Sequence, residues 1–573
     1  MRTTSIGAVL CVCASLSAVD QTAAQNARQF LDDRQTQIEE ARPKPQAGRI
    51  ATPSAVISAP EGASDIDLTL ASITLVGPND RPITSGEGLP LDQARAIYQS
   101  KIGQQITLAD VYGIAEDIDR SLKRSGFLFT RVLVPEQEFD RAGAKVKLRL
   151  LGTTVDQVSV EEPEGPIGPV KSLIQRMVQP LAGKKNPNIA DLERVSLLVS
   201  DLPGIVRATF VPSPGDQPNT VDLSMNVVRQ PFNAVGIVSY RDSPTIGPGV
   251  FGGIGYLNTY APFGASTEIS YFNSWGFEAS DFGERNTVEL TQRFFFETGT
   301  EVNFSGFLNR TKPGDVLEDL QISGDQLVFG LQVEHPVLRS RQASFWINAG
   351  FEWIDSEVDF GGNAITLTDD SSRVIELGAR GEVIDPFGET KLQLSLRKGL
   401  DILGATEEGD PDVSRAGASG DFFVIRGEVF RDQPLFGNFS ANLRMVGQWA
   451  DDTVLSSETL SLGGARYLKG YDPSEVQGDR GFASYLELRY ADSASIRDLN
   501  LRYQLYTFGD HGFVMQANGP DDKTDLTSTG FGTRVSVPRG PTIELELARP
   551  VGAPRLRTGD KDIRVFGSMV WFF

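Results

Sequence analysis

The sequence predicts a membrane all-β barrel of roughly sixteen antiparallel strands, preceded by two small α+β domains and a polar N-terminal helix. Residues 230–573 alternate between apolar and polar side chains almost to the last residue, and no convincing long amphipathic helix interrupts them. A strand with one apolar face and one charged face has to border two different solvents. At about 20 residues for each strand and its turn, this segment holds roughly sixteen strands, a channel-forming size.

The first 24 residues are typical of a secretory signal peptide. Arg2 supplies the positive start, Ile6–Ala18 is a short apolar run, and the small residues up to Ala24 suit cleavage. The run is too short to span a membrane, and no run of about 18 apolar residues follows it. We therefore expect export and removal of residues 1–24, and no helical membrane span.

The composition disfavours several classes of function. Both cysteines, Cys11 and Cys13, lie in the expected signal peptide, so we expect neither a disulfide framework nor a thiol nucleophile. His335 and His511 are the only histidines, which leaves little material for a metal cluster or a histidine-based triad. The net charge of -21 disfavours nucleic acid as a partner. The sequence also lacks a Gly-rich phosphate loop, and we expect no enzyme activity, no cofactor and no metal.

Residues 25–42 predict a helix that is polar nearly all round. Its only sizeable apolar residues are Phe30, Leu31 and Ile38, too few for the helix to join a core by itself. It is therefore either a solvated segment or a rod inserted into a wet cavity. Residues 43–65 begin with Pro43 and are rich in Pro, Ala, Ser and Gly, which predicts a linker.

Residues 66–152 and 153–229 predict two tandem α+β domains of similar plan. Their lengths suit small independent domains, and apolar residues recur at the spacing of helix core faces. The expected strands are Leu68–Val76, Phe127–Val134, Ala144–Leu151, Val155–Val160, Ile205–Val211 and Thr220–Val228, and the expected helices are Leu91–Tyr98, Leu108–Ser125, Ile167–Gln179 and Asn188–Ser200.

The strands of residues 230–573 favour a membrane barrel over a soluble sandwich only when they are taken together. Any single strand, such as Ile543–Leu547 with Glu544 and Glu546 on its polar face, is equally typical of a sandwich. However, aromatic residues gather near strand ends, as in membrane girdles, and no helix layer covers the strands. The final aromatic residue, Phe573, fits a terminal closing strand. Glu544 and Glu546 are then explained as residues of the channel lining, which disfavours an enzyme.

Ser461–Tyr490 places a glycine-rich, charged loop directly before one of these strands. Within the strand, Leu486 and Leu488 share a face, and Glu487 and Arg489 lie on the other. In the next expected strand Leu505 is on the apolar face, so Asp510, at the opposite parity, is expected to face the lumen. There a carboxylate can meet a cation inside the barrel.

The two α+β domains contain the motifs Ser125-Gly126-Phe127, Thr130-Arg131-Val132 and Leu202-Pro203-Gly204. In these motifs and in its domain order, nearly the whole chain after the signal resembles the transporters of two-partner secretion (the TpsB family of haemolysin and adhesin secretion/activation proteins), relatives of the barrel-assembly machinery. The resemblance implies that residues 66–152 and 153–229 are POTRA domains, that residues 25–42 are a plug helix, and that cargo binds at a sheet edge. That edge comprises Phe127, Thr130, Arg131 and Val132.

The loop Leu468-Lys469-Gly470-Tyr471 resembles the superfamily's signature at the tip of a long loop folded into the barrel. Phe508–Gly512 resembles the wall segment whose acid, here Asp510, pairs with the loop tip, and Gly478, Asp479 and Gly481 match the return of the loop to the strand. The family has arginine where this chain has Lys469. Lysine makes one movable contact instead of a bidentate fork, so we expect a Lys469–Asp510 pair that is easily broken. Arg466 is an alternative partner for Asp510.

The resemblance implies an outer-membrane pore that exports a large adhesin- or haemolysin-type exoprotein, with its POTRA domains in the periplasm. The implied partners are this exoprotein as an unfolded chain, outer-membrane lipid and the barrel-assembly machinery that inserts the barrel. The protein itself would be a monomer, with no nucleic-acid partner. One alternative is an assembly or insertion factor of the same superfamily, which usually has more than two POTRA domains. The other is a passive solute channel, which needs no polypeptide receptor.

Overall fold

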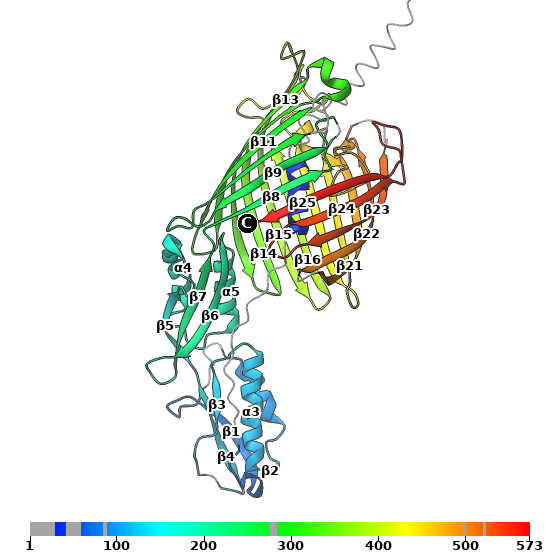
Figure 1. The fold of residues 1–573 in the computed structure, drawn as a ribbon. Coiled ribbons are helices and arrows are strands. Elements are labelled where there is room, and N and C mark those ends of the chain that lie inside the picture. The colour runs from blue at the N-terminus through cyan, green and yellow to red at the C-terminus, as the bar shows by residue number, and fades with distance from the viewer. Residues whose placement is uncertain are drawn as a thin grey trace, which may run out of the picture.

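The computed structural model describes residues 29–41, 59–83, 89–138, 140–243, 245–275, 283–496, 499–518 and 523–573. A barrel carries two small domains in line below one of its ends (Figure 1). The expected signal peptide and most of the expected linker lie outside the described residues. Among the described residues, no helix is both long and apolar enough to cross a membrane.

The first α+β domain is a four-stranded sheet covered by two helices. The strands have the order β2-β1-β4-β3, with β1 parallel to β4 and the other pairs antiparallel. Apolar residues at helical spacing, from Val111 to Leu122, bury one face of α3 against the sheet. Thr107 and Asp110 form a capping box that begins α3. The bounds are β1 Asp67–Val76, α2 Leu91–Gln99, β2 Gln105–Thr107, α3 Leu108–Arg124, β3 Arg131–Leu133 and β4 Ala144–Leu151.

The second α+β domain has a three-stranded sheet in the order β5-β7-β6. The expected helix Ile167–Gln179 is shorter in the structure, because Gly168, with φ 74°, and Pro169 place a separate 3-10 turn before it. The bounds are β5 Thr154–Glu161, η2 Gly168–Val170, α4 Lys171–Val178, η3 Gln179–Leu181, α5 Ile189–Ser200, β6 Ile205–Pro214 and β7 Thr220–Arg229.

Two glycines of the sequence motifs form the joints between the parts of the chain. Gly126 has φ 91° and accepts the backbone N–H of Ile189, at the start of α5, at 2.8 Å. A Cβ at Gly126 would lie 2.5 Å from Asn188 Oδ1. Gly204, with φ 76°, accepts the N–H of Gln230 at 2.7 Å, where the second domain meets the barrel. Both joints therefore need the backbone freedom and small volume of glycine.

The barrel is closed and has sixteen strands, as the alternation predicts. β25 pairs with β8, and the backbones of Phe573 and Ala234 exchange two hydrogen bonds. Outward-facing residues such as Leu505 and Leu545 are exposed, whereas Asp510 and Glu546 on the inner face are buried. The strands are β8 Phe232–Tyr240, β9 Gly249–Leu257, β10 Ser266–Trp275, β11 Glu284–Phe295, β12 Glu301–Lys312, β13 Ser323–Arg339, β14 Ala343–Phe360, β15 Ile365–Asp385, β16 Gly388–Gly399, β17 Phe423–Pro434, β18 Phe439–Ala450, β21 Arg480–Ile496, β22 Leu499–Met515, β23 Thr524–Ser536, β24 Thr542–Pro550 and β25 Arg564–Phe572.

The second α+β domain packs against the barrel end at which the chain enters β8, here called the near end; the opposite end is the far end (Figure 1). Arg339 at the end of β13 donates two hydrogen bonds to Asp201, of 2.7 and 2.8 Å. Arg341 lies 3.0 Å from Glu193 of α5, and Phe295 of β11 joins the apolar core of the second domain. The second domain thus contacts the rim of the barrel on the side of β11 and β13.

Candidate gate inside the barrel

A helix of residues 29–41 lies inside the barrel (Figure 1). Phe30 and Ile38 pack against inward residues of β8, β9, β10 and β25, and the rings of Phe30 and Phe272 meet edge to face with centroids 5.8 Å apart. The few apolar residues of this polar helix therefore attach it to one side of the wall. Of the two alternatives that the sequence leaves open, the structure shows the rod inserted into the barrel; residues 25–28 and 42 lie outside the described residues.

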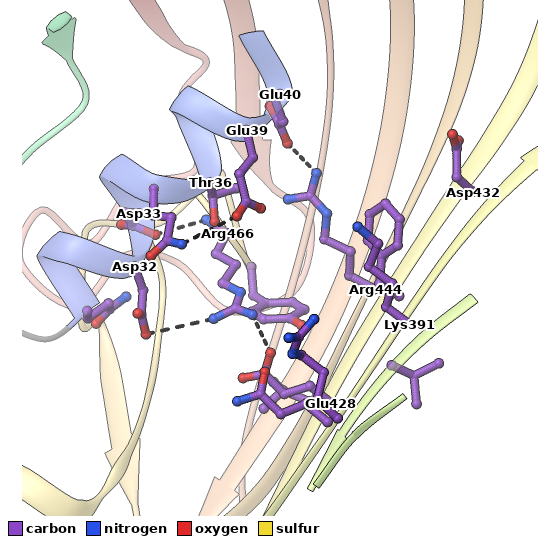
Figure 2. A pocket seen from close by; sticks show the side chains of 18 of the residues that line it. Asp32, Asp33, Thr36, Glu39, Glu40, Lys391, Glu428, Asp432, Arg444 and Arg466 are labelled. Atoms are coloured by element: carbon purple, nitrogen blue, oxygen red, sulfur yellow. Dashed lines mark hydrogen bonds and ion pairs between the residues drawn. The ribbon is translucent and has the colours of Figure 1, made fainter. Parts of the chain in front are cut away.

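A cavity of about 1750 Å³ separates the helix from the opposite wall (Figure 2). Charged residues of both signs line it, among them Asp32 and Glu39 of the helix and Lys391, Glu428 and Asp432 of the wall. Such a lining suits water and a polar chain. The helix therefore occupies one side of a polar channel.

The loop between β18 and β21, residues 451–479, folds back into the barrel. Its hairpin strands are β19 Leu460–Leu462 and β20 Val476–Gly478, and its tip is Leu468–Tyr471. A Cβ at Gly470 would lie 2.6 Å from the carbonyl carbon of Arg549 and 2.8 Å from Ser528 Cβ. Glycine is therefore required where the tip touches the wall. The Tyr471 hydroxyl donates to the carbonyl oxygen of Ala553 at 2.7 Å.

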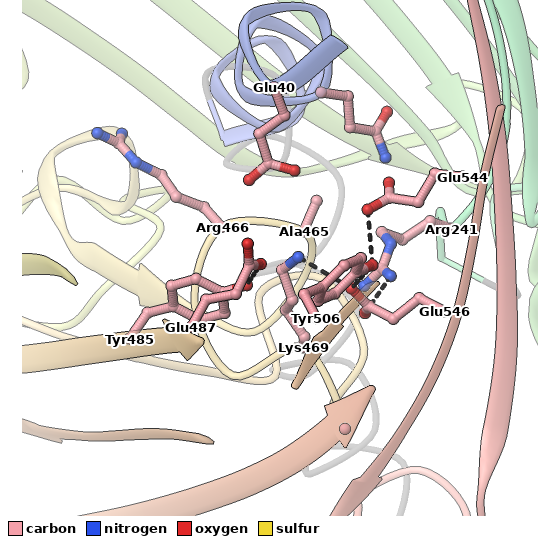
Figure 3. A network of polar contacts seen from close by, with 12 residues as sticks. Glu40, Arg241, Ala465, Arg466, Lys469, Tyr485, Glu487, Tyr506, Glu544 and Glu546 are labelled. Carbon is pink, nitrogen blue, oxygen red and sulfur yellow. Dashed lines mark hydrogen bonds and ion pairs between the residues drawn. The ribbon is translucent and has the colours of Figure 1, made fainter. Parts of the chain in front are cut away.

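The side chain of Lys469 pairs with Glu546, so the expected side-chain pair with Asp510 is wrong. Lys469 Nζ lies 3.0 Å from Glu546 Oε2, and the rings of Tyr485, Tyr506 and Phe508 surround the ammonium group at 5.1 to 5.9 Å (Figure 3). The Asp510 carboxylate instead accepts the backbone N–H of Lys469 at 2.9 Å.

The rest of the Asp510 carboxylate is already bound, which explains why the ammonium lies elsewhere. Ser528 donates both its backbone N–H, at 3.1 Å, and its hydroxyl to Asp510. Arg466, the alternative partner, pairs with Glu428 and lies 3.7 Å from Asp32 of the helix. Asp510 thus does meet the loop tip, as a backbone acceptor.

The internal helix and the inward loop bind each other directly. Both oxygens of the Asp33 carboxylate accept loop N–H groups, from Ala465 and Arg466, at 3.1 Å each. Gln29 donates to the Gly463 carbonyl oxygen and accepts from the Ser474 hydroxyl. Displacing the helix therefore removes partners from the loop.

The C-terminal end of the helix binds the same charged wall that holds the loop tip. Glu40 pairs with Arg444 (Figure 2) and with Arg534, the latter at 2.8 Å. Arg534 also lies 2.9 Å from Glu487 and from Glu544. Each of these carboxylates is buried, so loss of one partner leaves an uncompensated charge.

Sequence reasoning missed Glu546, Arg241 and Arg534 as members of this network. Arg241 shares Glu546 with Lys469. The parity of β24 already placed Glu546 on the inner face. Alternation along a strand shows which residues face the lumen but not which of them meet across it. The sequence alone could therefore not identify Glu546 as the partner of Lys469.

The remaining expected site residues lie outside the gate. β3 is an edge strand of its sheet, but it covers only Arg131–Leu133, because Phe127 and Thr130 lie in the turn before it. Phe127, Thr130 and Val132 are buried in the domain, and only the Arg131 side chain is exposed. Asp479 of the loop return is buried at the far end, between Gly478 and Gly481.

A sixteen-strand barrel that holds a helix and an inward loop, with two α+β domains at one end, is the architecture of an outer-membrane polypeptide transporter. Residues 303–535 match the model of the haemolysin secretion/activation protein ShlB/FhaC/HecB, and residues 83–152 match the ShlB-type POTRA domain. The chain belongs to this family of two-partner secretion transporters, which export a partner exoprotein across the outer membrane and are not enzymes. The POTRA domains lie in the periplasm, so the near end is periplasmic.

Individual relatives are distant in sequence. The heme/hemopexin transporter protein HuxB of Haemophilus influenzae is 22% identical over 489 residues, which cover 80% of each chain. The structure of CdiB from Escherichia coli matches with a TM-score of 0.72 at 16% identity, over 98% of this chain and 99% of that one. CdiB from Acinetobacter baumannii matches with a TM-score of 0.65 at 16% identity, over 98% of each chain. These structures share the fold.

Proposed function

We propose that this protein exports one large exoprotein of the adhesin or haemolysin type, and that the internal helix and the inward loop gate the export. The observation that carries the proposal is the direct contact of Asp33 with the loop backbone, inside a polar channel. A permanently open solute channel gains nothing from a helix held in its lumen by buried ion pairs. A gate for an occasional large cargo needs such a reversible closure.

The mature transporter arises by cleavage of its own signal peptide near Ala24. The cargo then enters it from the periplasm as an unfolded chain. The exposed edge strand β3, with Arg131, offers it backbone hydrogen bonds, which give affinity with little demand on sequence. The helix of residues 29–41 then leaves the lumen and the loop shifts. Folding of the cargo outside prevents it from sliding back.

The loop tip is the part of the gate that holds to the wall. Lys469, through Glu546, and Gly470 and Tyr471, through backbone contacts, hold it closed, while Asp510 fixes its backbone. Gly478, Asp479 and Gly481 return the loop to β21. The single ammonium contact makes this closure easier to open than a bidentate arginine fork would. The barrel acts as a monomer in outer-membrane lipid, where the barrel-assembly machinery inserts it.

Deletion of the gene tests the proposal. The culture medium should lack one large protein, and the plasmid-borne gene should restore it. Loss of many outer-membrane proteins would instead indicate an assembly factor, and an unchanged medium with reduced solute uptake would indicate a passive channel.

A further inference from the structure

A small apolar cluster lies inside the far end of the barrel. Phe422, at the end of the loop that joins β16 to β17, and Val454, in the stem of the inward loop, pack together inside the barrel. They contact Ile354, Val374, Val424 and Ala450, which are inward residues of β14, β15, β17 and β18. These six residues form an apolar patch on the inner wall that is separate from the charged lining of the cavity. We call these six residues the apolar lid.

The channel cavity ends below this lid. Its lining runs from Lys391 and Asp432 near the periplasmic mouth to Ser456–Ser461 of the inward loop. None of the six lid residues is among the described residues that line it. The apolar lid therefore lies beyond the described lining of the cavity, toward the far end of the barrel.

The ion pair of Arg415 and Asp479 connects the two loops that carry Phe422 and Val454 of the apolar lid. Arg415, in the loop between β16 and β17, makes two hydrogen bonds to the two Asp479 oxygens, the longer at 3.1 Å. Asp479 also accepts the N–H of Val454 at 3.0 Å and of Ala517 at 2.8 Å. Arg415 further donates to the Val454 carbonyl oxygen at 2.6 Å. Three segments of the far end, which carry Arg415, Val454 and Ala517, thus meet at the carboxylate of Asp479.

We propose that the Arg415–Asp479 pair is an outer latch, a second gate in series with the internal helix. This inference rests on the proposed export function and adds a gating site to it. A cargo chain that crosses the far end has to part the loop of Arg415 from the stem of Val454, and this breaks the pair and uncovers the apolar lid. Asp479 is fully buried, so a lost arginine leaves an uncompensated charge and favours the parted state.

The outer latch gives a structural role to Gly478, Asp479 and Gly481, the residues that lead the inward loop back into β21. Asp479 accepts four hydrogen bonds and immediately precedes β21. A Cβ at Gly478 would lie 2.7 Å from the Met515 carbonyl oxygen, and one at Gly481 would lie 2.5 Å from that of Phe513. The two glycines let Asp479 approach the segment that carries Ala517. The outer latch therefore depends on Gly478, Asp479 and Gly481 together, and on Arg415 opposite them.

Conductance of the full-length protein in planar lipid bilayers tests the outer latch. Four forms are compared: the unaltered protein, a deletion of residues 29–41, Arg415→Ala, and the deletion combined with Arg415→Ala. We expect the deletion alone to change the conductance little, and the combination to raise the occupancy of the open state about a hundredfold over the deletion alone. If Arg415→Ala fails to insert, Arg415→Lys takes its place. Lysine keeps the charge but not the bidentate contact of arginine, so the open-state occupancy should rise by an intermediate amount.

The matched control is Arg310→Ala, which breaks an exposed far-end pair with Asp325 (2.6 Å) and should change nothing. Equal conductance of the deletion and the combined form, both high, would overturn the outer latch and leave the helix as the whole gate. No rise in any form would instead count against the gated export channel itself.

Discussion

Lys469 and Glu546 form a buried ion pair across the lumen, with Nζ and Oε2 3.0 Å apart, and this pair connects the tip of the inward loop to β24. Arg241, the residue that follows β8, binds the same carboxylate. Glu546 of β24 therefore links the loop tip to the end of β8, the first strand of the barrel. The same carboxylate therefore binds the loop tip, through Lys469, and the end of β8, through Arg241.

Asp510→Asn should be milder than Asp510→Ala. The single amide oxygen of asparagine can still accept the N–H of Lys469, and its NH2 group can donate to the Ser528 hydroxyl, so that only the contact with the Ser528 N–H is lost. We expect normal insertion and nearly normal secretion for Asp510→Asn, and a clear loss for Asp510→Ala, measured as exoprotein in the medium. Equal losses would mean that the negative charge of Asp510 is what holds the loop.

Glu546→Gln should loosen the loop tip. The amide leaves the ammonium of Lys469 and the guanidinium of Arg241 without their shared carboxylate, at a cost of about 3 kcal/mol to the closed state. Trypsin should then cleave the loop at Lys469 faster in the full-length protein. Asp525→Asn, in an exposed pair with Lys523, is the control and should leave the cleavage rate unchanged.

Lys469→Ala should weaken the same contact from the other side and reduce secretion. A variant that inserts normally and secretes normally would show that Lys469 is not part of the gate. Heat-dependent migration of the barrel in gels establishes insertion, so a folding defect is recognised separately.

Asp33→Ala should release the internal helix. The change removes the acceptor of two loop N–H groups and should destabilise the plugged state by about 2 kcal/mol. Single-channel recordings in an Arg415→Ala background, in which the outer latch is already broken, should show more frequent openings than Arg415→Ala alone. Gln35→Ala, on the exposed side of the same helix, should not change the opening frequency.

Gly126→Ala should disrupt the joint between the two α+β domains. The added Cβ would collide with Asn188, and alanine disfavours φ 91°. We expect faster proteolysis between the domains and lower secretion. Gly113→Ala in α3 is the matched control: its Cβ meets no other described atom within 4 Å, and the change should stabilise the helix by about 0.5–1 kcal/mol. Equal behaviour of the two variants would refute the role of the joint.

Asp110 should make the first domain sensitive to acid. The backbone N–H of Thr107, and then its hydroxyl, bind the carboxylate and lower the pKa of Asp110. A folded-state pKa below the unfolded value stabilises the domain above about pH 4, and this stability is lost as the pH falls through the lowered pKa. In the full-length protein, amide exchange of α3 should rise on acidification in this range. The rise should be smaller in Asp110→Asn, whereas Asp117→Asn on the exposed face should behave like the unaltered protein.

The fold was largely predictable because its signals are local. Alternation along single strands predicted sixteen strands, and the Thr107–Asp110 cap marks the start of α3 at the expected residue. Segments whose structure depends on neighbours were less predictable. The edge strand β3 is shorter than Phe127–Val134, and the short strand β2 was not expected at all.

The gate was predictable in its parts but not in its pairing. The loop tip, the inward parity of Asp510 and the position of the helix could all be inferred from the sequence. Which lumen residues meet depends on the curvature of the barrel and on the depth of the loop, which no local pattern encodes. That is why the partner of Lys469 proved to be Glu546, and why Arg466 proved to bind Glu428.

Locking the internal helix to the inward loop tests the central claim most directly. No cysteine follows Cys13, so Gln29→Cys with Ser474→Cys introduces one pair, at side chains that touch in the closed state. A bis-methanethiosulfonate cross-linker, which joins the two thiols through disulfides and releases methanesulfinate, should stop secretion of the exoprotein, and a reductant should restore it, while either single cysteine secretes normally. Undiminished secretion with the cross-link complete would contradict the account, because the cargo would then pass without release of the helix from the loop.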